Sequence, residues 1–125
     1  SVNFTLAPGA VNREVMNTGD QTSTAEKISW IREAAGSRFG DIELSVTVFV
    51  CIVTDDQKGM AERVSGGFGM SAEEVLQTPH AVIGSTDQIA DALQERREKF
   101  GFSYVVFSGD GFEALAPVVK KLAGT

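Results

Sequence analysis

Few residues of this chain have side chains that could carry out acid–base, nucleophilic or metal chemistry. The sequence contains one cysteine, Cys51, and one histidine, His80, which excludes an internal disulfide and the usual zinc sites. A Ser-His-Asp triad would depend on His80, and no G-x-S-x-G motif accompanies it. His80 could act as a proton donor, but without an identifiable partner the simpler interpretation is a turn histidine. We therefore predict no metal site and assign no catalytic residue.

A second candidate is an anion site at a predicted helix start. Ser85 and Thr86 follow Gly84 and open a helix, and the free backbone amides of a helix N-terminus attract phosphate groups. Ser85 and Thr86 are therefore candidate cofactor-binding residues. Together with Gln88 they also form a capping box, in which the same groups satisfy the helix itself, and this alternative stays open.

The composition limits the class of protein. The chain has 125 residues, 42% of them hydrophobic and 22% charged, which is typical of one globular domain. A net charge of -6 argues against binding nucleic acid through its phosphates. No apolar run approaches the about 20 residues that a helix needs to cross a bilayer. The lone thiol fits a reducing, cytoplasmic setting, and Cys51 is expected to be a small buried hydrophobe within a strand.

Helices are predicted mainly from capping boxes, which begin at Ser23, Ser71 and Ser85. The first predicts a helix over residues 24–35 that ends at Gly36, the second a short helix that Pro79 terminates, and the third a helix to about residue 100. Another helix is expected over residues 57–65, broken by the glycines at 66, 67 and 69. The last helix has Pro117 in its first turn, where the missing amide costs nothing.

Three strands are predicted, over residues 2–6, 41–54 and 102–107, and residues 10–21 are expected to form a loop with at most one helical turn. The second strand is apolar on one face throughout, while its other face changes from polar to apolar. Such a strand is typical of a parallel sheet covered by helices. Residues 81–83 are apolar but too few to assign. Three parallel strands make a small sheet, so this α/β chain is expected to be part of something larger.

Several segments, in order and spacing, resemble the C-terminal part of luciferase-like monooxygenases, most closely the branch of probable deazaflavin-dependent oxidoreductases. The resemblance runs from about residue 25 to residue 125, through residues 31–39, 42–53, 71–76, 79–85, 96–101 and 116–124. The family fold is a (β/α)8 TIM barrel of about 250 residues. The resemblance therefore implies that residues 1–125 are one unit, the C-terminal portion of such a barrel, and that the N-terminal half has no counterpart here.

The resemblance also implies a site. In a (β/α)8 enzyme the reacting groups lie where strands end, which would place Thr5, Thr54 and Ser108 in a substrate pocket beside Asn3 and Asp55. Turn and helix capping is the ordinary role of such residues. The parent protein would bind coenzyme F420 (a deazaflavin) or FMN and a small-molecule substrate, and would catalyse hydride transfer or monooxygenation. The isolated chain is expected to bind no cofactor and to be inactive.

Two other functions remain open. The first is a non-enzymatic α/β module that acts through self-association or partner binding, since open strand edges recruit partners. Both the oxidoreductase and the module are compatible with a homo-oligomer or with pairing to a missing barrel half. The second is a small flavodoxin-like binder, for which residues 7–10 are a poor phosphate loop. Arg96 and Arg97 could contact an acidic cofactor tail, although charges near a helix end are normally solvated, and Trp30 lies off the apolar stripe of its helix.

Overall fold

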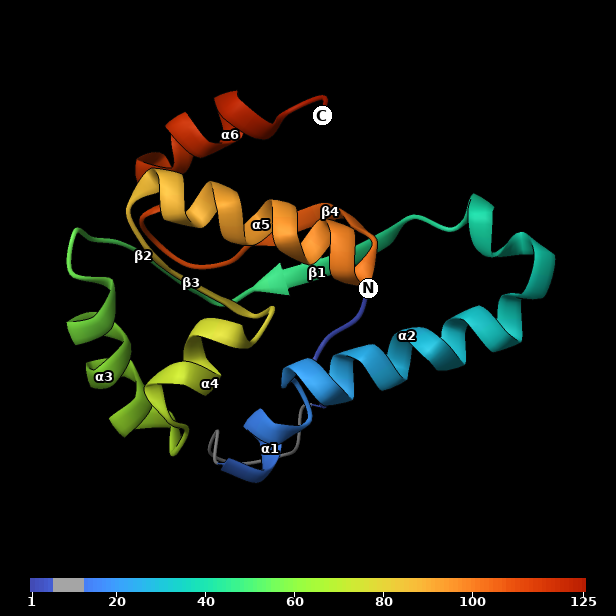
Figure 1. Cartoon of the computed structure of the whole chain (residues 1–125), viewed down its shortest axis with the longest axis horizontal. Coiled ribbons are helices and arrows are strands. Elements are labelled where there is room, and N and C mark those ends of the chain that lie inside the picture. Colours follow the sequence, from blue (N-terminus) through green and yellow to red (C-terminus); the bar gives the residue numbers. More distant parts are fainter. Residues whose placement is uncertain (6–12) are drawn as a thin grey trace.

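The computed structural model of the chain describes residues 1–5 and 13–125, and it confirms the α/β class. In this part of the chain the strands pair in parallel, as two short ladders. Strands β1 (Leu44–Val48) and β4 (Phe102–Phe107) form one ladder, and β2 (Val50–Val53) and β3 (Ala81–Gly84) form the other. Figure 1 shows the strands crossing the middle of the molecule between two groups of helices.

The helices of the described residues separate these strands. They are α1 (Arg13–Asn17), α2 (Gln21–Ala35), α3 (Gln57–Phe68), α4 (Ala72–Gln77), α5 (Thr86–Phe100) and α6 (Ala116–Leu122). Two 3-10 helices, η1 (Gly36–Asp41) and η2 (Phe112–Leu115), follow α2 and precede α6. The capping boxes at Ser71 and Ser85 are both present, and Pro117 lies in the first turn of α6.

Two helix boundaries differ from the prediction. Helix α2 starts one turn early because Asp20, and not Ser23, is its N-cap: the Asp20 carboxylate accepts a hydrogen bond from the Ser23 amide at 2.7 Å. Helix α3 continues through the two glycines, whose helix propensity is low, and ends only at Gly69 in the left-handed conformation. Phe68, the last residue of α3, packs against the buried cluster that includes Met70 and Val75, and the predicted break at residues 66 and 67 is wrong.

The strand assignment also needs correction. The predicted strand over residues 41–54 is divided at Phe49, where the amides of Phe49 and Val50 both approach the carbonyl of His80, at 2.9 and 3.3 Å. This doubled contact is the signature of a β-bulge. Residues 81–84 do form a strand. Residues 2–5 form none, although Val2 donates to the Ser45 carbonyl at 2.8 Å; the rest of that predicted strand and its turn lie outside the described residues, and residues 13–17 are helical.

The strand formed by β1 and β2 is central, because its two edges have different partners. Alternate residues of a parallel strand bond to opposite edges. The Val48 carbonyl accepts from Ser108, beyond β4, whereas the Ser45 carbonyl accepts from Val2 on the other edge. Strand β3 joins that second edge further along, beyond the bulge. The order across β1 is therefore the N-terminal segment, β1 and β4, and the order across the whole sheet is β3, β1–β2, β4.

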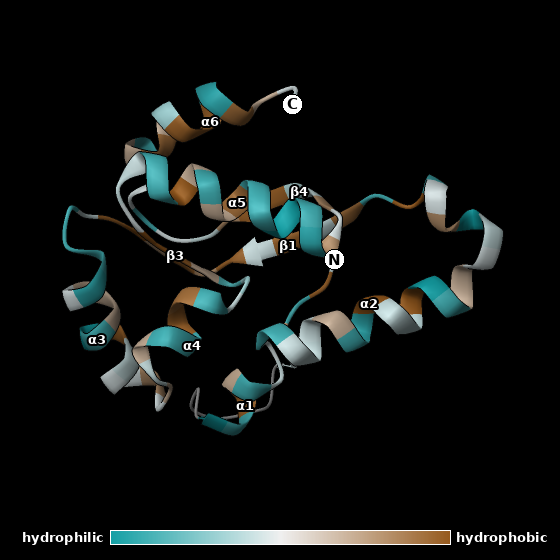
Figure 2. Cartoon of the chain, in the orientation of Figure 1, coloured by the Kyte–Doolittle hydropathy of each residue, from teal (hydrophilic) through white to brown (hydrophobic). Residues whose placement is uncertain are grey.

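The helices cover the sheet in two layers. Helices α5 and α6 pack on one face, in a core cluster of fully buried side chains: Val48, Val82, Ile89, Ala90, Leu115 and Val118. Helices α3 and α4 pack on the opposite face of β2 and β3, around Val75, Ala81 and Ile83. A third cluster joins α2 to the start of β1 and β4. Figure 2 shows that the strands consist largely of hydrophobic residues, whereas the helices on either side of them mix hydrophilic and hydrophobic residues.

One face of β4 has no such cover. Tyr104 and Val106 are 56% and 40% exposed, whereas Val105 and Phe107 pack against α5 and α6. Trp30 on α2 is also 56% exposed. Parallel sheets are normally covered on both faces, so this face of β4 is available to a further part of the protein or to a partner. Within the described residues, no helix is both long and apolar enough to cross a membrane.

Candidate functional site

The carboxyl ends of β2 and β3 bring two of the predicted site regions together. The Thr54 amide donates to the Gly84 carbonyl at 2.8 Å, so Thr54 lies beside the start of α5, where Ser85 and Thr86 are. Gln57, in the first turn of α3, also reaches β3 through a 3.0 Å bond from Nε2 to the Ile83 carbonyl. Thr54 and Ser85 thus lie together at the carboxyl ends of β2 and β3, as expected for residues that follow neighbouring parallel strands.

The polar groups at the start of α5 are already engaged with each other. The Ser85 Oγ accepts from the Gln88 amide at 3.2 Å, and the Gln88 Oε1 accepts from the Ser85 amide at 2.9 Å. Asp87, in the same turn, forms an exposed ion pair with Lys121 at 3.3 Å. A phosphate would have to displace the capping box and approach a carboxylate. The groups present at the start of α5 therefore fit a helix cap better than a phosphate site.

The other predicted pocket residues lie elsewhere. The Ser108 amide bonds to the Val48 carbonyl, so β4 ends beside the middle of the central strand and not beside Thr54. Thr54 lies six positions after Val48, a separation of about 20 Å along an extended strand. Thr5 is exposed, and its amide donates to the Thr18 Oγ1 at 2.8 Å, next to α1. The structure therefore does not gather Thr5, Thr54 and Ser108 into one pocket.

His80 is buried and not an ordinary exposed turn residue. It is 2% exposed, its Nδ1 lies 2.8 Å from the Thr47 carbonyl, and its Nε2 is buried with no hydrogen-bond partner among the described residues. The Thr47 carbonyl can only accept, so Nδ1 carries the proton in the neutral ring. Phe4 and Phe49 lie against the ring, with centroids 5.1 and 6.0 Å away.

Burial lowers the pKa of His80 below its ordinary value of 6.5, partly offset by the Thr47 carbonyl and reinforced by Lys27 and Arg96. The folded state therefore binds a proton less readily than the unfolded chain. We therefore expect His80 to leave the free energy of unfolding unchanged above about pH 6.5. Below that pH, protonation of His80 in the unfolded chain should lower the free energy of unfolding by at most about 1.4 kcal/mol per pH unit.

Urea unfolding of the wild type and of His80→Gln between pH 7.5 and pH 5 measures this effect. The wild type should lose stability faster than the variant below pH 6.5. Because the chain has a single histidine, its ring resonances give the pKa in the folded protein directly, and a value at or above 6.5 would contradict the prediction.

Arg96, a candidate for contact with a cofactor, lies in a different environment from the one predicted from the sequence. It is 7% exposed, and its guanidinium donates to the carbonyls of Leu76, Pro79 and Ala81 at 3.2, 3.4 and 2.8 Å. Burial lowers its pKa to about 10. Arg96 therefore closes the end of α4 and the outer edge of β3 and does not face a cofactor tail. Its place on the apolar stripe of α5, four residues after Ala92, was the available signal.

The remaining candidates have structural roles. Cys51 is half-buried in β2, and burial raises the pKa of its thiol, in agreement with a packing role. Arg97 is exposed and donates to the Thr125 carbonyl. No group of three or more His, Cys, Asp and Glu residues in the described part of the chain could hold a metal ion.

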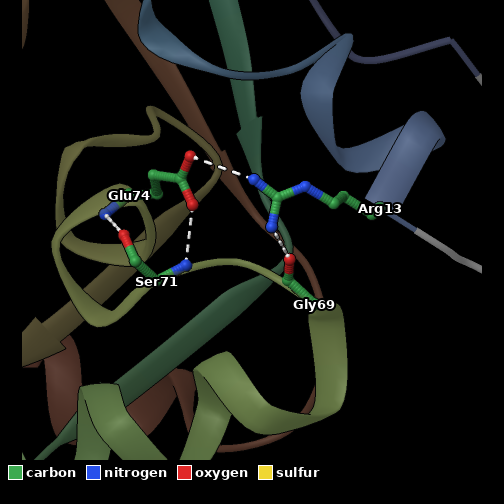
Figure 3. Close-up of polar contacts among 4 residues, drawn as sticks. All are labelled: Arg13, Gly69, Ser71 and Glu74. Atoms are coloured by element: carbon green, nitrogen blue, oxygen red, sulfur yellow. Dashed lines mark hydrogen bonds and ion pairs between the residues drawn. The ribbon is translucent and has the colours of Figure 1, made fainter.

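A charged contact not predicted from the sequence connects α1 to the start of α4 (Figure 3). Arg13 donates to the Gly69 carbonyl and lies 3.6 Å from the Glu74 carboxylate. The other Glu74 oxygen accepts from the Ser71 amide at 2.7 Å, and this bond, followed by Arg13, lowers the pKa of Glu74. The contact fixes α1 over the junction of α3 and α4.

Comparison with family models, with curated proteins and with solved structures gives no significant match for this chain.

Proposed function

We propose that this chain is the C-terminal portion of a luciferase-like (β/α)8 oxidoreductase that uses coenzyme F420 or FMN, and that by itself it is inactive. The observation that carries the proposal is the order of the N-terminal segment, β1 and β4. Val2 and Asn3 lie beside Ser45 and Thr47, on the edge of β1 opposite β4. Successive strands of a barrel are neighbours in this way.

The uncovered face of β4 also supports the proposal. Helices α5 and α6 cover the face of β1 and β4 that would point outward in a barrel, and the opposite face carries Tyr104 and Val106 in exposed positions. In a closed barrel this opposite face would point inward and be covered by the other strands, so α3 and α4, which pack on the same face of β2 and β3, would have to lie elsewhere in the barrel. The cofactor would supply the hydride chemistry, and this chain would supply part of the wall.

Strand β3 is the feature that the proposal must accommodate. It pairs with β2 on the edge of the central strand that the N-terminal segment would occupy in a barrel if that segment continued as a full strand. Its outer edge is already closed by side chains, because Arg96 bonds the Ala81 carbonyl and Gln57 bonds the Ile83 carbonyl. In the barrel, one of two changes would be needed. Either β3 would give up its pairing with β2, or the strand formed by the N-terminal segment would end before the point where β3 begins.

A cofactor titration tests the proposal. FMN and coenzyme F420 are added separately to this chain and to the complete protein encoded by its gene, and absorbance and fluorescence are recorded. We expect spectral shifts on binding with the complete protein and none with the isolated chain. Absence of any shift with the complete protein, shown by circular dichroism to be folded, would refute the oxidoreductase assignment.

A second candidate function is a non-enzymatic module that self-associates. The specific observation in its favour is the closure of the β3 edge by Arg96 and Gln57, since protected edges are typical of sheets that are complete. The exposed face of β4 would then be the contact between copies. Light scattering combined with the cofactor titration separates the two functions: a stable homodimer that Tyr104→Lys disrupts, with no cofactor binding by the complete protein, favours the module.

A further inference from the structure

A cavity of about 270 Å³ lies at the amino end of β3, between the strands and helices α1, α3 and α4. Its walls include three aromatic rings and three flexible or branched aliphatic side chains, from Phe4, Phe49, Phe68, Met16, Val64 and Val75. Phe49 is 40% exposed, so the wall continues to the protein surface there. A concave site lined mainly by aromatic and aliphatic side chains is typical of small-molecule pockets.

The few polar groups of the wall are bonded within the protein. Thr78 Oγ1 donates to the Gly19 carbonyl at 2.8 Å, and His80 Nδ1 is bonded to the Thr47 carbonyl. No charged side chain is among the described residues of the wall. A charged or strongly polar ligand would lose its hydration without gaining partners. The wall chemistry therefore selects a neutral, apolar ligand.

The cavity is held open by fixed elements. Met16 on α1 belongs to the same buried cluster as Met70 and Val75, and α1 is fastened to the α3–α4 junction by the contact of Arg13 with Gly69 and Glu74 (Figure 3). On the opposite wall, the His80 ring is oriented by its bond to Thr47 and packs on Phe4. Walls positioned in this way keep their shape without a ligand, as most small-molecule sites do.

We propose that this cavity binds a small, neutral, mainly aromatic molecule of a size between benzene and indole. An apolar cavity of about 150 Å³ is large enough to bind benzene, and stacked or edge-on contacts with the three phenylalanines would favour a flat ring. The cavity lies at the amino end of β3, whereas the proposed cofactor would lie at the carboxyl ends of the strands. The two proposals are independent.

Indole and toluene are suitable probes, and the full chain is the protein to use. Indole titrated to millimolar concentration should shift the amide resonances of Val75 and Ala81 and raise the melting temperature. Val64→Phe fills the cavity from α3 and should weaken binding at least tenfold. Val119→Phe makes the same change at a 52% exposed helical site on α6, away from the cavity, and should bind within twofold of the wild type.

Two results would overturn the proposal: no shift of these resonances in the folded wild type, or equal binding by Val64→Phe and Val119→Phe. Benzoate tests the ligand class, because it carries a charge on a ring of the size of toluene, and binding as tight as that of toluene would exclude a neutral-ligand site. If Val64→Phe does not fold, Met16→Phe fills the cavity from α1 and takes its place. None of these measurements involves FMN or coenzyme F420.

Discussion

Replacing Arg96 by leucine is expected to lower the free energy of unfolding by about 3 kcal/mol. The guanidinium is 7% exposed and bonds to three carbonyl groups, two at the end of α4 and one in β3. Leucine fills part of the volume but leaves these carbonyls without a donor, and a hydrogen bond from a charged group is worth about 1.5–3 kcal/mol. The free energy lost with the three hydrogen bonds exceeds the desolvation penalty that is removed with the buried cation, because all three carbonyl acceptors lose their donor together.

The neighbouring arginine provides a matched control. Arg97 lies on the same helix but is exposed, and its guanidinium donates to the Thr125 carbonyl, so Arg97→Leu should change the stability by less than about 0.5 kcal/mol. Urea unfolding of both variants at pH 7 measures the difference. Equal effects of the two substitutions would mean that the buried guanidinium does not stabilise the junction of α4 and β3.

Ile89→Ala is expected to cost about 3 kcal/mol as well, for a different reason. Ile89 is 1% exposed in the cluster that joins α5 to Val48, Val82 and Leu115, and truncating a buried isoleucine to alanine typically costs about 2–5 kcal/mol. Helix α5 presents Ser85 and Thr86 at the carboxyl end of β3, so a loosened α5 would also disturb that edge.

Ile42 serves as the control for this substitution, because it is the same residue type at 37% exposure. Ile42→Ala should cost only about 1 kcal/mol, since more than a third of the Ile42 surface already faces water and less apolar area is lost on truncation. Denaturant unfolding measures both values. A loss for Ile89→Ala no larger than that for Ile42→Ala would show that the layer of α5 and α6 does not contribute a cooperative core.

Features that depend on neighbours in the sequence were predictable. The capping boxes at Ser71 and Ser85 join residues three apart, so the pattern alone identifies the start of α4 and of α5, and Gly101 marks the end of α5 in the left-handed conformation. Strand β4 was also predicted with its observed bounds. Asp20 shows the limit of this reasoning: Ser23 was predicted as the cap of α2, but Asp20, three positions earlier, is the cap in the structure.

Features that depend on distant contacts were not predictable. Strand β3 has four residues that are all buried, so it lacks the alternation that identifies a half-exposed strand, and it was left unassigned. The bulge at Phe49 lies where the central strand changes from pairing with β4 on one edge to pairing with β3 on the other. The burial of His80 and Arg96 depends on where α4 ends relative to β3, a relation between segments that no local pattern encodes.

The sequence by itself therefore determined the α/β class, most helix starts and the strand over residues 102–107, because these follow from the periodicity and hydrogen bonding of nearby residues. Only the tertiary structure decided which strands pair, that Thr54 and Ser85 share an edge while Thr5 and Ser108 lie apart, and that an apolar cavity forms beside His80. These properties arise where segments far apart in the chain meet, and their free energies depend on burial and on partners that appear only after folding.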